Sequence, residues 1–179
     1  MPVETQPGIA ASTLTLDEYL HTVYHPDCDF VDGHIEERNM GETAHGLLQV
    51  ELAFWFRLHK AEWGIRVISE LRTRVGPDRV RIPDISVVLN DAALKEQVRV
   101  TPPLLAIEIL SPEDRLPRVK KRLRDFLVMG VENIWLLDPQ KRSAFTYNEN
   151  GLCPFDGSRL CVPDSPIYID LPEIFSALD

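Results

Sequence analysis

The hydrophobic pattern of the chain is clearest in two short runs, PDISVVL at residues 83–89 and LLAIEIL at residues 104–110. Nearly continuous Val, Ile and Leu residues over this length are typical of strands that are buried on both faces of a sheet. One carboxylate interrupts each run, Asp84 in the first and Glu108 in the second. We therefore expect two buried strands whose acids lie at a strand end or line a cleft.

Ahead of these strands, local signals predict a tail, a short helix and a hairpin. Residues 1–12 are polar and lack periodicity, so we expect them to form a flexible tail. Thr15 and Glu18 have the spacing of a capping box, which opens a short helix. Residues 29–36 read as two short strands around an Asp-Gly turn, which predicts a β-hairpin.

Residues 43–63 predict a long helix that ends near Gly64. His45 lies in its first turn, where a histidine is more often solvated or hydrogen-bonded than a ligand. The apolar positions of the helix predict a wide buried face formed by Leu47, Leu48, Val50, Leu52, Phe54, Trp55, Phe56 and Leu58.

The second acid-bearing strand leads into a helix that the sequence marks at both ends. Ser111 is a favourable N-cap, Pro112 suits the first helical position, and acids follow in the first turn. Apolar residues continue to Met129, and Gly130 is a typical helix end. Residues 90–101, before the strand, predict a polar connection with at most one helical turn.

The remaining pattern completes an α/β fold with one mixed sheet flanked by helices. There is no internal repeat and no long linker, so we expect residues 13–179 to form a single domain. Further strands are expected at residues 65–75, 80–82, 133–137, 144–147 and 167–169, with a final helical turn at residues 172–178.

Composition excludes several classes of protein. With 179 residues, 44% of them hydrophobic and 26% charged, the chain suits one globular domain. No apolar run has the length of a membrane span, and the N-terminal residues lack the pattern of a signal peptide. We therefore expect a cytoplasmic protein with no membrane partner. Reduced thiols are expected at Cys28, Cys153 and Cys161, which are irregularly spaced.

The net charge of −9 argues against a general nucleic-acid coat protein, which would carry an overall positive charge. The predicted helix at residues 112–129 is a local exception. Its period places Arg115 and Arg122 at one edge of the buried stripe and Lys120 and Arg124 near the other, whereas Lys121 faces solvent. A solvated face that compensates the many acids is the alternative interpretation. The six cations are Arg115, Arg118, Lys120, Lys121, Arg122 and Arg124.

Asp84 and Glu108 suggest a metal site. Neighbouring strands lie about 4.8 Å apart, so carboxylates on the same side of two such strands can share a cation. Oxygen ligands of this kind suit Mg²⁺ or Mn²⁺, and such an ion supports phosphodiester hydrolysis. The alternative is that each acid caps a loop or pairs with a nearby arginine.

Five stretches in the same order resemble the Uma-two-type restriction endonuclease family, a branch of the PD-(D/E)xK nuclease superfamily. They are DFVDGHIEER, NMGETAHGLLQVELAFWFR, RIPDISVVL, LLAIEILSPEDR and FLVMGVENIWLLDP. The resemblance covers most of the chain between Thr15 and Tyr147. It implies a restriction-endonuclease-like mixed sheet, with Asp84 and Glu108 as metal ligands and the Ile109 carbonyl as a candidate third ligand.

The sequence departs from this resemblance at its basic residue. The superfamily has a lysine two residues after the second acid, where this chain has Leu110. The family places that lysine in the next helix, four residues before a tyrosine, where this chain has Arg122 and Phe126. Arginine stabilises negative charge but does not titrate near neutral pH, so it cannot act as a general base. Asp29 also replaces a family glutamate.

Three functions remain open from the sequence. The leading hypothesis is a DNA endonuclease that uses Mg²⁺ or Mn²⁺, with Arg122 or Lys120 neutralising the charge that develops on the phosphate and the other cations of the helix binding DNA. The second is a catalytically silent nucleic-acid-binding or regulatory module. The third is a purely structural or oligomer-forming protein. A homodimer would fit the resemblance, because nucleases of this kind often pair two sites.

Overall fold

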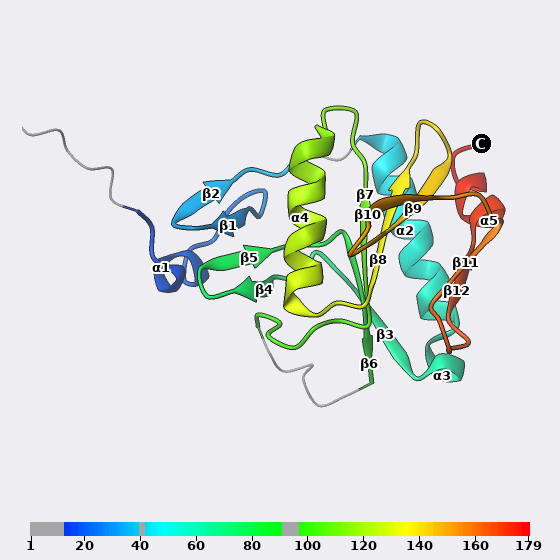
Figure 1. Cartoon of the computed structure of the whole chain (residues 1–179), viewed down its shortest axis with the longest axis horizontal. Coiled ribbons are helices and arrows are strands. Elements are labelled where there is room, and N and C mark those ends of the chain that lie inside the picture. The colour runs from blue at the N-terminus through cyan, green and yellow to red at the C-terminus, as the bar shows by residue number, and fades with distance from the viewer. Residues whose placement is uncertain (1–12, 40–41, 91–96) are drawn as a thin grey trace, which may run out of the picture.

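The computed structural model describes residues 13–39, 42–90 and 97–179 (Figure 1). The expected tail at residues 1–12 and part of the expected connection at residues 90–101 lie outside these ranges. The elements are α1 (Leu16–Leu20), β1 (Asp29–Val31), β2 (His34–Glu36), α2 (Thr43–Leu58), α3 (Lys60–Trp63), β3 (Ile65–Ser69), β4 (Thr73–Gly76), β5 (Arg79–Arg81), β6 (Ile85–Leu89), β7 (Leu105–Ile109), α4 (Leu116–Met129), β8 (Asn133–Asp138), β9 (Ser143–Asn148), β10 (Gly151–Phe155), β11 (Arg159–Cys161), β12 (Tyr168–Asp170) and α5 (Leu171–Ser176).

A six-stranded mixed sheet is the centre of the fold and confirms the expected α/β class. Its strand order is β10-β9-β8-β7-β6-β3, in which only β7 and β8 are parallel. The expectation of a single sheet is wrong, because β2-β1-β5-β4 form a separate smaller sheet and β11 pairs with β12. The acid-bearing strands β6 and β7 are neighbours, and apart from Leu89 their residues are buried. The prediction of two buried strands from the two apolar runs is thus confirmed.

Helices pack on opposite faces of the large sheet, with α4 on one side and α2 on the other (Figure 1). Within the described residues, no helix is both long and apolar enough to cross a bilayer. All three cysteines are free, as expected. The capping box of Thr15 and Glu18 and the hairpin between β1 and β2 are also confirmed.

The prediction of one wide buried face on residues 43–63 is wrong. The sheet covers only one side of α2, because a helix in an outer layer buries one stripe against the sheet. A break at His59 also separates α2 from α3. The buried positions are Leu48, Leu52, Trp55 and Phe56, whereas the exposed fraction is between 45% and 69% at Leu47, Val50, Phe54 and Leu58.

The predicted helix start at Ser111 is also wrong, because α4 begins at Leu116 with Arg115 as its N-cap. Pro117 gives the physical reason. A helix that began at Pro112 would hold Pro117 in its interior, where proline costs about 3 kcal/mol. Residues 111–114 instead form a turn, in which the Asp114 N–H donates to the Ser111 carbonyl at 2.9 Å. The helix ends at Gly130, with a positive φ, as predicted.

Arg81 connects the smaller sheet to α4 through three carboxylates. Its side chain is fully buried, and its nitrogens lie 2.9 Å from Asp29, 2.7 Å from Glu36 and 2.7 Å from Asp125. Each carboxylate has a second donor for its other oxygen: Ile82 N–H for Asp29, Lys121 for Glu36 and Arg79 for Asp125. All six carboxylate oxygens of this cluster therefore have a partner.

Replacing Arg81 should destabilise the fold strongly. Arg81→Met leaves Asp29 and Asp125 buried without their main cation, and losing one partner of a buried ion pair costs about 3–5 kcal/mol. Arg142→Met is the matched control, because Arg142 and Asp179 form an exposed pair worth about 0–1 kcal/mol. Urea denaturation measures both losses, and equal losses for the two variants would contradict a structural role for the Arg81 cluster.

Candidate active site

Asp84 and Glu108 lie beside each other at the junction of β6 and β7. These strands are antiparallel and pair Ile85 with Ile107, so the next position in the register sets Asp84 across from Glu108. Both carboxylates are buried and line one cavity of about 20 Å³. A space of this size holds a single water molecule or ion. The other lining residues are Arg38, Asn39, His45, Ile109, Ser111, Asp114 and Arg122.

Asp84 is held by three donors from different parts of the chain. Arg38 Nη2 lies 2.8 Å from Oδ1, whereas the Ile109 N–H donates to Oδ2 at 2.8 Å. His45 Nε2 lies 3.3 Å from Oδ2. Burial alone would raise the pKa of Asp84, but the hydrogen bond and charge of His45, followed by the charge of Arg38, hold that pKa below its usual value. Asp84 is therefore a fixed negative charge.

Glu108 is less completely satisfied than Asp84. Arg122 Nη2 lies 3.0 Å from Glu108 Oε2, whereas Oε1 is buried without a hydrogen-bond partner among the described residues. Burial raises the pKa of Glu108 to about 7, although the Arg122 charge acts in the opposite direction. The carboxyl group therefore gains or loses its proton easily near neutral pH, and an added cation would favour the charged form.

Arg122 reaches this cavity from the buried face of α4. The same Nη2 that contacts Glu108 lies 3.6 Å from Asp114 Oδ1, and Asn39 Nδ2 donates to that oxygen at 3.0 Å. Asp114 Oδ2 accepts the Ser111 N–H at 2.9 Å. The turn before α4 and the helix itself are thus joined through one carboxylate.

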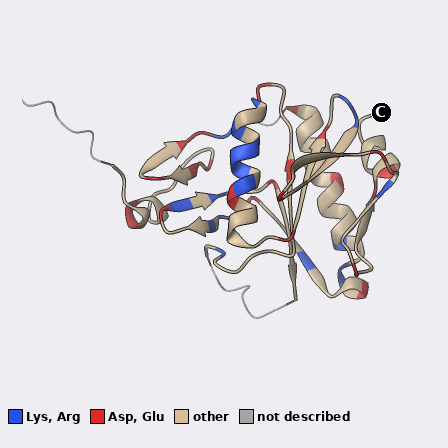
Figure 2. Ribbon diagram, viewed as in Figure 1, with Lys and Arg blue, Asp and Glu red and all other residues tan. Residues whose placement is uncertain are grey.

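The other predicted cations lie on the outer side of α4 or at its N-terminus, where Figure 2 shows Lys and Arg along the first half of the helix. Lys120 is exposed and does not line the cavity. Arg118 donates to the Glu37 carbonyl, and Lys121 lies 3.3 Å from Glu36, so both contact the segment that ends the first hairpin. Arg115 and Arg124 are exposed and form no ion pair with the described residues.

Sequence reasoning missed Arg38, Asn39 and Asp114 as cavity residues. Arg38 and Asn39 follow the hairpin without a periodic pattern, so no local signal marks them. His45 received the more common interpretation of a solvated or satisfied histidine, and its bond to Asp84 makes it a satisfied histidine inside the candidate site. Asp29, at the family glutamate position, pairs with Arg81 and does not line the cavity.

The donor set fits a divalent cation in its chemistry. Two buried carboxylates face one cavity, and the unpartnered Glu108 Oε1 is the oxygen that such an ion would satisfy. Among residues 13–39, 42–90 and 97–179, no group of three or more His, Cys, Asp and Glu side chains forms a metal cluster. An ion here would therefore need backbone oxygen or water as further ligands, as Mg²⁺ commonly does.

Comparison with known proteins shows the family and the fold of the chain. No curated protein matches the chain. The crystal structure of a protein from Anabaena variabilis ATCC 29413, titled a "putative nuclease belonging to DUF820", matches with a TM-score of 0.79 and 27% sequence identity. The alignment covers 93% of this chain and 99% of that chain. A family model described as "Putative restriction endonuclease" matches residues 16–165, and the chain therefore belongs to the Uma2 family.

Proposed function

We propose that this protein is a divalent-metal-dependent endonuclease that hydrolyses phosphodiester bonds in DNA. The observation that carries the proposal is the convergence of Asp84 and Glu108 on one buried cavity, with one oxygen of Glu108 left without a partner. Membership of a family described as restriction endonucleases supports the same reaction class. In this proposal Asp84, Glu108 and the Ile109 carbonyl hold Mg²⁺ or Mn²⁺.

A bound divalent ion supplies Lewis acidity toward a phosphoryl oxygen and lowers the pKa of a coordinated water. The residues of the chain supply the remaining functions. His45 and the Ile109 N–H orient the Asp84 carboxylate. Arg122 and Arg38 line the same cavity and carry permanent charge, so a phosphate that approached a bound ion would meet two guanidinium groups. Arginine in place of lysine thus keeps charge stabilisation but provides no general base.

The exposed cations of α4 are proposed to bind the nucleic-acid backbone. Arg115, Lys120 and Arg124 are exposed and form no ion pair with the described part of the chain, so their charges are available to phosphates. Arg118 and Lys121 belong to the same surface, although both also contact the hairpin segment. Such contacts position a strand without reading its sequence.

A catalytically silent nucleic-acid-binding module is the second candidate, and one observation favours it. Arg38 already neutralises Asp84, and Arg122 already neutralises Glu108, so the two acids are compensated without an ion. A protein of this kind would bind DNA in a salt-sensitive manner and would not cleave it.

Removing either acid should abolish metal-dependent cleavage. We expect the protein to nick supercoiled plasmid in Mg²⁺ or Mn²⁺ and to stop when EDTA is added. Asp84→Asn and Glu108→Gln should each lower the rate by roughly 10²-fold or more, as expected for groups that organise transition-state charge. Glu149→Gln, in the exposed β9–β10 turn, is the matched control. Nicking that survives both active-site changes would refute the proposal, whereas binding without nicking would favour the second candidate.

Variants of Arg122 and Lys120 should show which of the two residues supplies the catalytic cation. Arg122→Met should lower the nicking rate by about 10²–10³-fold, the usual cost of losing one transition-state charge stabiliser. Arg122→Lys should recover much of that loss if charge is the contribution of this residue. Lys120→Met should reduce nicking less than Arg122→Met, because Lys120 lies outside the cavity. A larger loss of nicking in Lys120→Met than in Arg122→Met would assign the catalytic cation to Lys120. Arg142→Met controls for a general loss of positive charge.

A further inference from the structure

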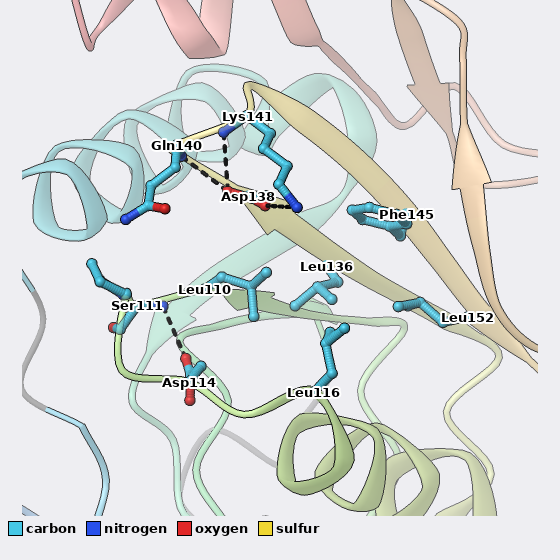
Figure 3. Close-up of a pocket in the computed structure, with 11 residues that line it drawn as sticks. Leu110, Ser111, Asp114, Leu116, Leu136, Asp138, Gln140, Lys141, Phe145 and Leu152 are labelled. Atoms are coloured by element: carbon cyan, nitrogen blue, oxygen red, sulfur yellow. Dashed lines mark hydrogen bonds and ion pairs between the residues drawn. The ribbon is translucent and has the colours of Figure 1, made fainter.

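A second and larger cavity lies next to the one that holds the acids (Figure 3). Its volume is about 240 Å³, which is below the roughly 300–1,000 Å³ of pockets for drug-sized ligands. The space equals that of about eight water molecules at roughly 30 Å³ each. The cavity therefore has room for one small ring system.

The two cavities share a wall, which is the turn at residues 111–114. Ser111 and Asp114 line both cavities, and Asp114 also contacts Arg122 at 3.6 Å. Leu110 in the larger cavity and Glu108 in the smaller one are two residues apart on one extended segment, so their side chains point to the same face. Two residues of strand span about 6.6 Å. One or two nucleotides of a nucleic-acid strand cover this distance, since the rise is about 3.4 Å per nucleotide.

The lining combines apolar faces with a polar rim. Leu110 and Leu136 lie between two polar groups in Figure 3. Asp138 at the end of β8 and Gln140 and Lys141 in the following turn form one group, and Ser111 and Asp114 lie across from them. Phe145 adds an aromatic ring to the apolar lining. An apolar slot suits the faces of a flat ring, and polar side chains at its rim suit the hydrogen-bonding edge of that ring.

Leu116 marks the mouth of this cavity. It is the first residue of α4 and is 50% exposed, although its neighbours Leu110 and Leu136 in the cavity are more buried. A ring that entered the cavity would cover part of this exposed apolar side chain, which is a favourable change.

We propose that this cavity binds one unstacked nucleobase of the strand whose phosphate lies at Asp84 and Glu108. The inference rests on the proposed function and names its substrate class: nucleic acid in which a base near the cleaved bond can leave the stack. A base in a single strand or a mismatch leaves the stack at a lower cost than a paired base. Such substrates are therefore bound and cleaved in preference to fully paired duplex.

Fluorescence of 2-aminopurine tests the proposal, because this base becomes brighter when it leaves the stack. Single-stranded oligonucleotides with one 2-aminopurine at successive positions are titrated with the full-length protein in EDTA, so that no cleavage occurs. We expect the fluorescence to increase on binding when the 2-aminopurine stands at one particular position of the oligonucleotide. Leu116→Trp, which fills the mouth, should remove the rise and weaken binding by roughly tenfold, the size of one base-stacking contact. Val128→Trp, at an exposed position of the same helix, should change neither the fluorescence increase nor the affinity for the oligonucleotide.

Three outcomes would overturn the inference. The first is that fluorescence polarisation shows binding of the oligonucleotide, but the 2-aminopurine intensity increases at no labelled position. The second is a rise that Leu116→Trp and Gln140→Ala both leave unchanged, with folding of each variant checked by circular dichroism. The third is loss of the rise when unlabelled deoxyadenosine monophosphate is added at the concentration of the oligonucleotide, because the site would then serve a free nucleotide. Plasmid nicking by the same protein preparations in Mg²⁺ without EDTA separates the two proposals, since nicking in any of these cases leaves the proposed function intact.

Discussion

Buried carboxylates must have a cation or hydrogen-bond donors in contact, and this requirement organises both the fold and the candidate site. At Arg81 the three carboxylates meet the requirement, because every oxygen of Asp29, Glu36 and Asp125 has a donor, whereas Arg81 Nη2 itself has no partner among the described residues. At Glu108 it is met only in part, because Oε1 has no partner among the described residues. A carboxylate whose two oxygens both have donors stabilises the structure, whereas an unpartnered carboxylate oxygen can still bind a cation. This contrast distinguishes the two groups of buried charges.

The sequence could predict the strands and their acids, because the signal there is local. The runs around Asp84 and Glu108 are apolar enough to require burial, and the strands are neighbours as expected. The sequence could not predict which side of α2 faces the sheet, because apolar residues such as Leu48 and Phe54 occur on both sides. Arg38 and His45 reach Asp84 only through the tertiary fold, so no spacing in the sequence marks them.

The late start of α4 has consequences for both cavities. Ser111 and Pro112 resemble a helix start, but Pro117 is best tolerated in a first turn, and the helix begins at Leu116. Residues 111–114 are therefore a turn rather than a helix, and Ser111 and Asp114 line the acid cavity as well as the larger cavity beside it. The position of one proline thus connects the proposed catalytic residues to the proposed base-binding cavity.

The central claim is that Asp84 and Glu108 together hold a divalent cation although each already has an arginine partner. Anomalous diffraction from crystals soaked in MnCl₂ tests it most directly, because manganese scatters anomalously and light atoms do so only weakly. We predict one anomalous peak between the two carboxylates, within bonding distance of Glu108 Oε1. Crystals that show no peak there, with Arg38 still on Asp84 and Arg122 still on Glu108, would contradict the claim.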